Sequence, residues 1–140
     1  MANKNYQIIE HIADIGIRVK ASEPKGLFSA AAKAMFSIIA EPLKQKKQEA
    51  HKFSVGVKAD NYEELLVNWL NELLSLSAVE EKIFTNFKFV VFGDRELEAE
   101  ATGFDVSGYK INTEIKAATY RNLKVEQVKG SWIAEVIFDV

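Results

Sequence analysis

Three acidic groups at opposite ends of the chain are the ones best suited to chemistry. Asp14 interrupts a run of isoleucines in HIADIGI (11–17), and Asp139 is followed only by Val140, whose main-chain carboxylate adds a further anionic group. Carboxylate oxygens are the preferred ligands of hard cations such as Ca²⁺ or Mg²⁺, and unpaired carboxylates held close together raise one another's pKa. If the two segments meet, we expect Asp14, Asp139 and Val140 to form a divalent-cation site. The alternative is two independent aspartates at strand ends.

Other catalytic signatures are absent from the sequence. The chain has no cysteine, which excludes disulfides, thiolate metal sites, cysteine nucleophiles and thiol redox chemistry. The patterns GxxxxGK(S/T), GxGxxG, GxSxG and HExxH do not occur, so nucleotide cradles, nucleophile elbows and helical zinc sites have no support. His11 and His51 are too few for a histidine-rich metal site. A metal-dependent hydrolase would also need a clear base or nucleophile, so we expect no enzymatic activity.

Composition predicts one ordinary domain and argues against direct nucleic-acid binding. The 140 residues are 48% hydrophobic and 27% charged, which suits a single domain over 1–140. The formal net charge of -2 is unlike the basic surface of a protein that grips many phosphates, so a role with RNA would run through a partner. With no secretory signal and no run of about 20 apolar residues, we expect a cytoplasmic protein without membrane contact.

Hydrophobic periodicity in the first half predicts three strands and one helix. Ser22 is a candidate N-cap with proline in the first turn behind it, and the apolar spacing that follows predicts an amphipathic helix ending near Pro42. The lysine-rich stretch 43–52 lacks an apolar period and is expected to be an exposed loop. Alternation predicts strands at 6–11, 15–21 and 53–59.

A second helix is the firmest structural expectation. Asp60 and Glu63 have the spacing of a capping box at its start. A broad apolar stripe follows, which predicts that one face, with Trp69, is buried against a sheet. The stripe consists of Leu65, Leu66, Trp69, Leu70, Leu73 and Leu74. The polar residues off the stripe are expected to face water: Asn68, Asn71, Glu72 and Ser75.

The second half reads as a meander of strands. Segments with a period near two are separated by Gly-Asp, Ser-Gly, Arg-Asn and Gly-Ser turn signals. The predicted strands are 87–92, 96–104, 110–120, 123–129 and 132–140. Two early helices and a late run of strands are typical of an α+β fold, with the two helices packed on a mostly antiparallel β-sheet in a single domain.

Five stretches in this order resemble the archease family over nearly the whole chain. They are EHIADIGIRVKA, the AAxAMF helix at 31–36, LLVNWLNELLSL, TEIKAATYRNLKV and WIAEVIFDV. The resemblance implies a small α+β accessory protein of the RtcB-type RNA ligase, the enzyme that joins tRNA exon halves and other RNA ends. Such a factor promotes guanylylation and turnover of the ligase, and binds a divalent cation through acidic residues. The alternative is a chaperone or modulator of RNA-modifying enzymes such as tRNA methyltransferases.

The resemblance also assigns individual residues. Its acidic cation ligands fall on Asp14 and Asp139, which matches the cluster proposed from spacing. Its lysine falls on Lys116, a candidate for contact with the partner, although an outward charge on an alternating strand is an equal interpretation. His11 matches the family histidine and is expected to act as a hydrogen-bonding group near the corner.

Three positions depart from the family pattern. Ile12 stands in place of a usual threonine, Phe104 in place of a usual acidic residue, and Arg121 where histidine often follows the tyrosine. These differences leave the expected cation ligands intact. They weaken the match over 103–121.

Overall fold

The computed structural model describes residues 5–10, 14–44 and 48–140. It places the side chains of all of these residues except residue 10. His11 and the corner around it therefore lie outside the described residues. The elements in chain order are β1 Tyr6–Glu10, β2 Asp14–Ala21, α1 Pro24–Ile39, β3 Ala40–Pro42, β4 His51–Lys58, α2 Tyr62–Glu80, β5 Lys82–Phe92, β6 Glu96–Asp105, the 3₁₀ turn η1 Val106–Gly108, β7 Tyr109–Ile111, β8 Ala117–Val128 and β9 Ser131–Asp139.

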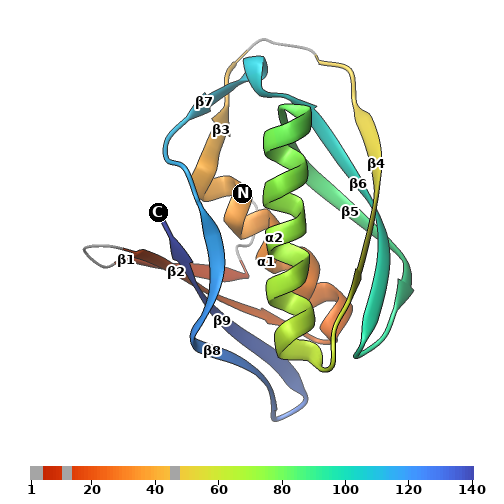
Figure 1. The fold of residues 1–140 in the computed structure, drawn as a ribbon. Coiled ribbons are helices and arrows are strands. Elements are labelled where there is room, and N and C mark those ends of the chain that lie inside the picture. The colour runs from red at the N-terminus through yellow and green to blue at the C-terminus, as the bar shows by residue number, and fades with distance from the viewer. Residues whose placement is uncertain (1–4, 11–13, 45–47) are drawn as a thin grey trace.

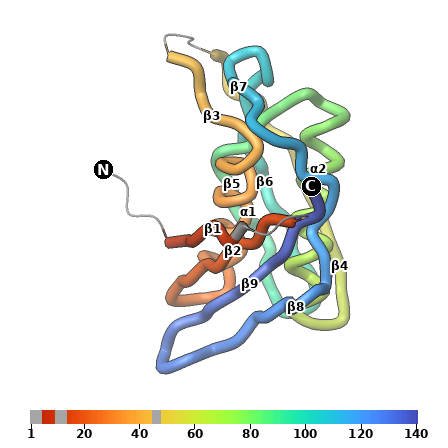
Figure 2. Tube along the Cα trace, turned by 90° about the vertical axis from the view of Figure 1, so that its left-hand side faces the viewer, coloured from red at the N-terminus to blue at the C-terminus, as the bar shows by residue number. Residues whose placement is uncertain are grey.

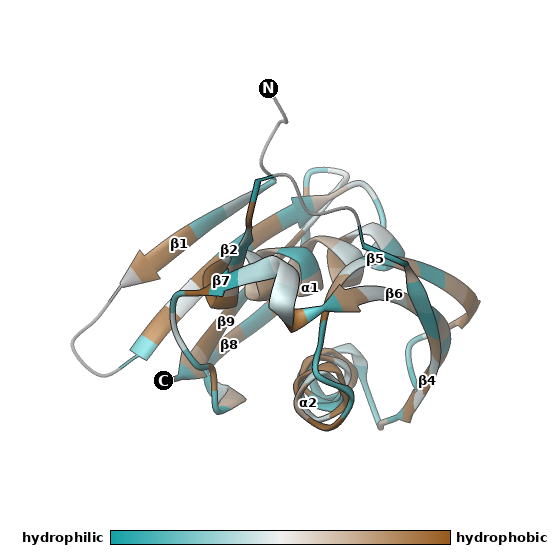
Figure 3. Ribbon diagram, turned by 90° about the horizontal axis from the view of Figure 1, so that it is seen from above, coloured by the Kyte–Doolittle hydropathy of each residue, from teal (hydrophilic) through white to brown (hydrophobic). Residues whose placement is uncertain are grey.

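Within the described residues, antiparallel strands form three sheets on which two helices pack (Figure 1). The strand orders are β1-β2-β9-β8, β4-β6-β5 and the short pair β3-β7. Seen from above, α1 lies between the two larger sheets, and α2 packs between β8 of one sheet and β4 of the other (Figure 3). The predicted α+β class is confirmed, with the strands divided among several sheets rather than one.

The core lies where both helices meet the inner faces of the sheets. The predicted apolar face of α2 is confirmed: Leu66, Trp69, Leu70 and Leu73 are all fully buried. The buried indole N–H of Trp69 donates a hydrogen bond to the carbonyl oxygen of Phe28 in α1 at 3.1 Å, so its burial leaves no unpaired donor. No helix among the described residues combines the length and apolarity needed to cross a membrane.

The first helix begins one residue later than the Ser22 cap predicted. Its N-cap is Glu23, which makes no side-chain capping bond, and Pro24 occupies the first helical position. A residue that precedes proline is restricted to extended backbone, and Glu23 has φ -148° and ψ 158°. The ring of Pro24 therefore sets this boundary in place of a capping side chain.

The second helix begins with a capping arrangement shifted by one residue from the predicted pair Asp60 and Glu63. Asn61 is the N-cap, and its side-chain oxygen accepts from the backbone N–H of Glu64 at 2.8 Å. The Glu64 carboxylate in turn accepts from the backbone N–H of Asp60 at 3.1 Å. Asn61 takes the cap because its backbone is extended and its amide oxygen reaches the third helical N–H.

Several strand boundaries differ from those predicted. β4 begins at His51, inside the predicted loop, and β5 begins at Lys82, directly after the left-handed Glu81 that ends α2. Register shifts at 84/86 and 89/91 break the alternation of β5, which explains why the sequence pattern missed its first half. The predicted strand 110–120 is divided into β7 and the start of β8 by an irregular stretch at 112–116.

Candidate functional site

Strand pairing brings the two predicted aspartates together. β2 and β9 are antiparallel neighbours, and Asp14 lies directly opposite Asp139 in their register (Figure 2). Ile17 and Phe138 are fully buried on the inner face of this sheet. Because side chains alternate along a strand, Asp14 and Asp139 belong to the opposite, outer face. The expected proximity of the two segments is confirmed.

Arg121 joins the two carboxylates. Its Nη1 donates to Asp14 Oδ2 at 3.2 Å, and its Nη2 donates to Asp139 Oδ1. The Asp14 side chain is 15% exposed, whereas those of Asp139 and Arg121 are 50% and 52% exposed. The sequence marked Arg121 as part of a turn signal and as a departure from a family pattern, and neither indicated this contact. The guanidinium offsets the repulsion that two facing carboxylates would otherwise experience.

An irregularity in β8 positions Arg121 beside the aspartates. The register with β9 jumps from Thr119↔Ile137 to Lys124↔Glu135, so four residues of β8 lie opposite one residue of β9. Within this bulge Asn122 has φ 51°, a left-handed conformation that asparagine tolerates. The Arg-Asn pair predicted a turn between two strands. The structure instead places it in a bulge within one continuous strand.

Thr119 links the bulge to the strand that carries Asp139. Its hydroxyl donates to the carbonyl oxygen of Ile137 at 2.8 Å and accepts from the backbone N–H of Arg121 at 3.3 Å. The Arg121 backbone is thereby tied to β9 two residues before Asp139. The long side chain retains its own rotatable bonds above this anchor.

Asn71 of α2 fixes the start of β8. Its side-chain oxygen accepts from the Ala118 N–H at 2.8 Å, and its Nδ2 donates to the Ala118 carbonyl oxygen at 3.2 Å. β8 is the edge of its sheet, and this carboxamide satisfies both backbone groups at that position. Asn71 and Asn68 were expected to face water, and both are only partly exposed; Asn68 also donates to the Lys58 carbonyl oxygen at 3.0 Å. Glu72 and Ser75 are exposed, as expected.

One oxygen at the site has no partner among the residues that the structure describes. Asp14 Oδ1 is buried and accepts no hydrogen bond from any of them. An unpaired buried carboxylate oxygen is costly, and a hard cation is the kind of ligand that would satisfy it. Within the described residues, no group of three or more His, Cys, Asp or Glu side chains could hold a metal ion. The described residues therefore supply two acidic side chains at this point, those of Asp14 and Asp139.

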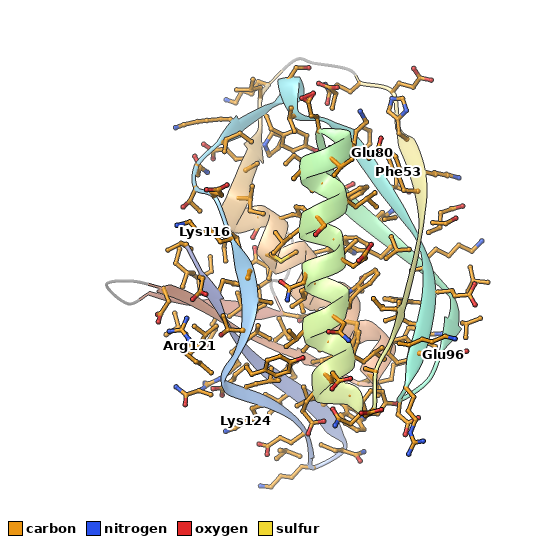
Figure 4. The ribbon with its side chains drawn as sticks, viewed as in Figure 1. Phe53, Glu80, Glu96, Lys116, Arg121 and Lys124 are labelled. Atoms are coloured by element: carbon orange, nitrogen blue, oxygen red, sulfur yellow. The ribbon has the colours of Figure 1, made fainter. Side chains whose placement is uncertain are left out.

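The other residues predicted for the site are Lys116, Val140 and His11. Lys116 is exposed, and its backbone N–H donates a hydrogen bond to the carbonyl oxygen of Asp139 at 2.8 Å. Lys116 is outward-facing, as the alternative interpretation expected, but it lies in the irregular stretch directly before β8 rather than within a strand. Figure 4 shows Lys116, Arg121 and Lys124 on the β8 side of the molecule, opposite β4. Val140 follows β9 and is 37% exposed, and His11 lies outside the described residues.

These features define a single-domain α+β protein with paired carboxylates where its second and last strands, β2 and β9, pair. The model of the archease protein family matches residues 6–140, and the chain belongs to this family. The chain is 33% identical to the protein archease of Methanosarcina barkeri, with 98% of this chain and 97% of the relative covered. It is also 33% identical to the protein archease of Pyrococcus abyssi, with 98% and 99% covered.

Two solved structures have the same fold. The solution structure of Methanobacterium thermoautotrophicum protein 1598 superposes with a TM-score of 0.75 at 25% identity, covering 99% of this chain and all of the other. The crystal structure of a Thermotoga maritima archease, described as a possible chaperone, gives a TM-score of 0.68 at 21% identity over 96% of each chain. The second likeness concerns the fold alone.

Proposed function

We propose that this protein is a non-catalytic, cytoplasmic accessory factor of an RtcB-type RNA ligase, which promotes guanylylation and turnover of the ligase through a divalent-cation site. The observation that carries the proposal is the pairing of Asp14 with Asp139, in which one buried oxygen of Asp14 accepts no hydrogen bond from residues 5–10, 14–44 or 48–140. Membership in the archease family supports the choice of partner. RNA would be engaged only through the ligase, since the net charge is -2.

The residues at this point fit a hard cation. Asp14 and Asp139 would hold it through carboxylate oxygens, together with the Val140 terminus. When bound, such a cation supplies positive charge that neutralises phosphate oxygens during nucleotidyl transfer. Ca²⁺ and Mg²⁺ both match these donors.

Lys116 is the residue proposed to contact the partner. Its backbone is hydrogen-bonded to that of Asp139, so it adjoins the cation site, and the residue is exposed. An ammonium group at this position can bind a phosphate or a carboxylate of the ligase. The two aspartates and Lys116 would then act on one surface.

A guanylylation assay tests the proposal. Purified ligase, GTP and a divalent salt are mixed with or without this protein, and formation of the ligase–GMP intermediate is followed with time. We expect faster formation with the protein, loss of most of the acceleration in Lys116→Ala, and retention in Lys124→Ala, a control on the same side of the molecule. Unchanged kinetics with the parent protein, or RNA ligation or hydrolysis by the protein alone, would contradict the proposal.

A second candidate function is that of a chaperone or modulator of RNA-modifying enzymes such as tRNA methyltransferases. The observation that favours it is the description of the Thermotoga maritima archease as a possible chaperone. Affinity capture from an extract of the source organism separates the two functions. Recovery of an RNA methyltransferase without an RNA ligase would favour the second.

A further inference from the structure

We propose that Arg121 is a built-in competitor of the divalent cation, a tethered positive charge that occupies the aspartate pair until a cation displaces it. The inference rests on the proposed cation site and concerns how that site is regulated. It starts from the finding that Arg121 bonds to one oxygen of Asp14 and one of Asp139. Those same carboxylates are the proposed ligands of the ion.

Arg121 and a divalent ion cannot both occupy the aspartate pair without strong repulsion. The guanidinium carries a full positive charge at every physiological pH. A divalent ion bound by the same two carboxylates would lie within a few ångströms of that charge, where like charges repel most strongly. Cation binding must therefore displace the arginine, and the free energy of its two ion pairs opposes cation binding.

The arginine satisfies the site only in part. It contacts Asp14 through Oδ2, whereas Oδ1 of the same carboxylate is buried and has no hydrogen-bond partner within the described part of the chain. Ca²⁺ readily accepts both oxygens of one carboxylate, and so can satisfy an atom that Arg121 leaves unpaired. This difference favours exchange of the guanidinium for the ion.

The surroundings of Arg121 permit the exchange. Its side chain is 52% exposed, so a displaced guanidinium is solvated at little cost. The described anchor of its backbone is the hydrogen bond to Thr119, which does not involve the side chain. Arg121 can therefore leave the aspartates by rotating about its own side-chain bonds while β8 keeps its register.

Calorimetric titration of the chelator-treated protein with CaCl₂ and with MgCl₂ tests the inference. The variant Arg121→Gln keeps a long polar side chain without the charge. We expect it to bind at least one of these cations about tenfold more tightly than the parent, because no ion pair has to be broken.

The matched control is Arg18→Gln. Arg18 forms an ion pair of 2.9 Å with Glu135 on the same two strands and the same outer face, four register positions from Asp14 and Asp139. At about 3.3 Å per residue this separation exceeds the Debye length at physiological salt. Arg18→Gln should therefore bind the cation like the parent.

A second measurement distinguishes the loss of the Arg121 ion pairs from a general folding defect in Arg121→Gln. Thermal unfolding without cation should show a lower midpoint than the parent, because the two carboxylates then face each other unneutralised. A saturating concentration of the cation bound should remove that deficit, whereas the effect of Arg18→Gln should not depend on the cation. An unfolded Arg121→Gln that the cation fails to refold would count against the inference.

The outcomes separate this inference from the proposed function. Equal or weaker cation binding by Arg121→Gln overturns the inference, whatever the ligase assay gives. No detectable binding by either protein overturns both the inference and the cation site of the proposed function. Tighter binding by Arg121→Gln upholds it. If the parent protein then fails to accelerate guanylylation, the ligase proposal alone is lost.

Discussion

The two aspartates of the candidate site occupy different environments although they face each other. The Asp14 side chain is mostly buried and contains the unpaired oxygen, whereas that of Asp139 is half exposed. A mostly buried carboxylate loses more hydration on folding and gains more from a ligand. Of the two, Asp14 should therefore contribute more to cation binding.

Replacement of either aspartate tests this difference. Asp14→Asn should weaken cation binding at least about tenfold, and Asp139→Asn should weaken it less, because each removes a charged ligand oxygen. Calorimetric titration measures both, with Glu135→Gln on the same outer face as control. Unchanged affinity in Asp14→Asn would remove the cation site.

At the scale of elements, the contact between β5 and β6 depends on a missing side chain. Gly103 lies opposite Phe84 in the register, and a Cβ atom at Gly103 would lie 2.8 Å from the Phe84 ring. That ring is fully buried and packs edge-on against Phe36 and Phe53. The ring therefore has little room to move away.

Gly103→Ala should lower the free energy of unfolding by about 1–3 kcal/mol, the usual cost of overpacking. Gly56→Ala in β4 is the control, since a Cβ there would meet its nearest neighbours only at 4.0 Å, and it should change stability by less than about 0.5 kcal/mol. Urea unfolding of both variants measures the difference. Equal stability of the two would show that Phe84 can relax.

The turn between β6 and β7 should respond to pH. The Asp105 carboxylate accepts from the backbone N–H of Ser107 at 2.9 Å, and this bond, then the Ser107 hydroxyl, lower the pKa of Asp105 below its ordinary value of 3.8. Lys82, 3.6 Å away, acts in the same direction. The charged form is thus favoured in the folded state.

Because the folded pKa is lowered, this contribution to stability is present above the unfolded pKa and is lost as pH falls through the folded pKa. Asp105→Asn should therefore have a lower free energy of unfolding than the parent at pH 7, and the difference between the two proteins should narrow as pH falls below the ordinary pKa of 3.8. Urea unfolding of both proteins at pH 7 and at a pH below the ordinary pKa of Asp105 measures the difference in their free energies of unfolding. A difference that does not change with pH would show that the Asp105 charge has no part in it.

At the scale of the whole molecule, the candidate site depends on the pairing of β2 with β9, two strands that are far apart in the sequence. Asp14 begins β2, and Asp139 ends β9 one residue before Val140. If the terminal carboxylate of Val140 is a ligand, a change at that end alone should alter cation binding.

A five-residue Gly-Ser extension after Val140 tests this arrangement, because it converts the terminal carboxylate into a neutral amide. We expect weaker cation binding in titration and an unchanged unfolding midpoint without cation. The same extension placed before Met1 is the control. Parent-like affinity with the C-terminal extension would show that Asp14 and Asp139 suffice without the terminus.

Much of the fold could be predicted because its signals are local. The apolar spacing around Trp69 requires a helix with one buried face, and the alternation of β2 requires a strand with one buried face. Boundaries were less predictable, because Pro24 and Asn61 set helix starts through backbone geometry that composition does not reveal. The type of an element follows from many residues, whereas its end depends on one.

The candidate site was also predictable only in part from the sequence. The sequence by itself determined that Asp14 and Asp139 interrupt or end apolar strands, and that their oxygens suit a hard cation. Only the tertiary structure decided that they face each other, because strand order depends on packing between distant segments. The tertiary structure also decided that Arg121 lies between them, because a bulge in β8 directs its side chain toward the two aspartates. The residue types that form this bulge are also typical of turns, so the sequence could not distinguish the two.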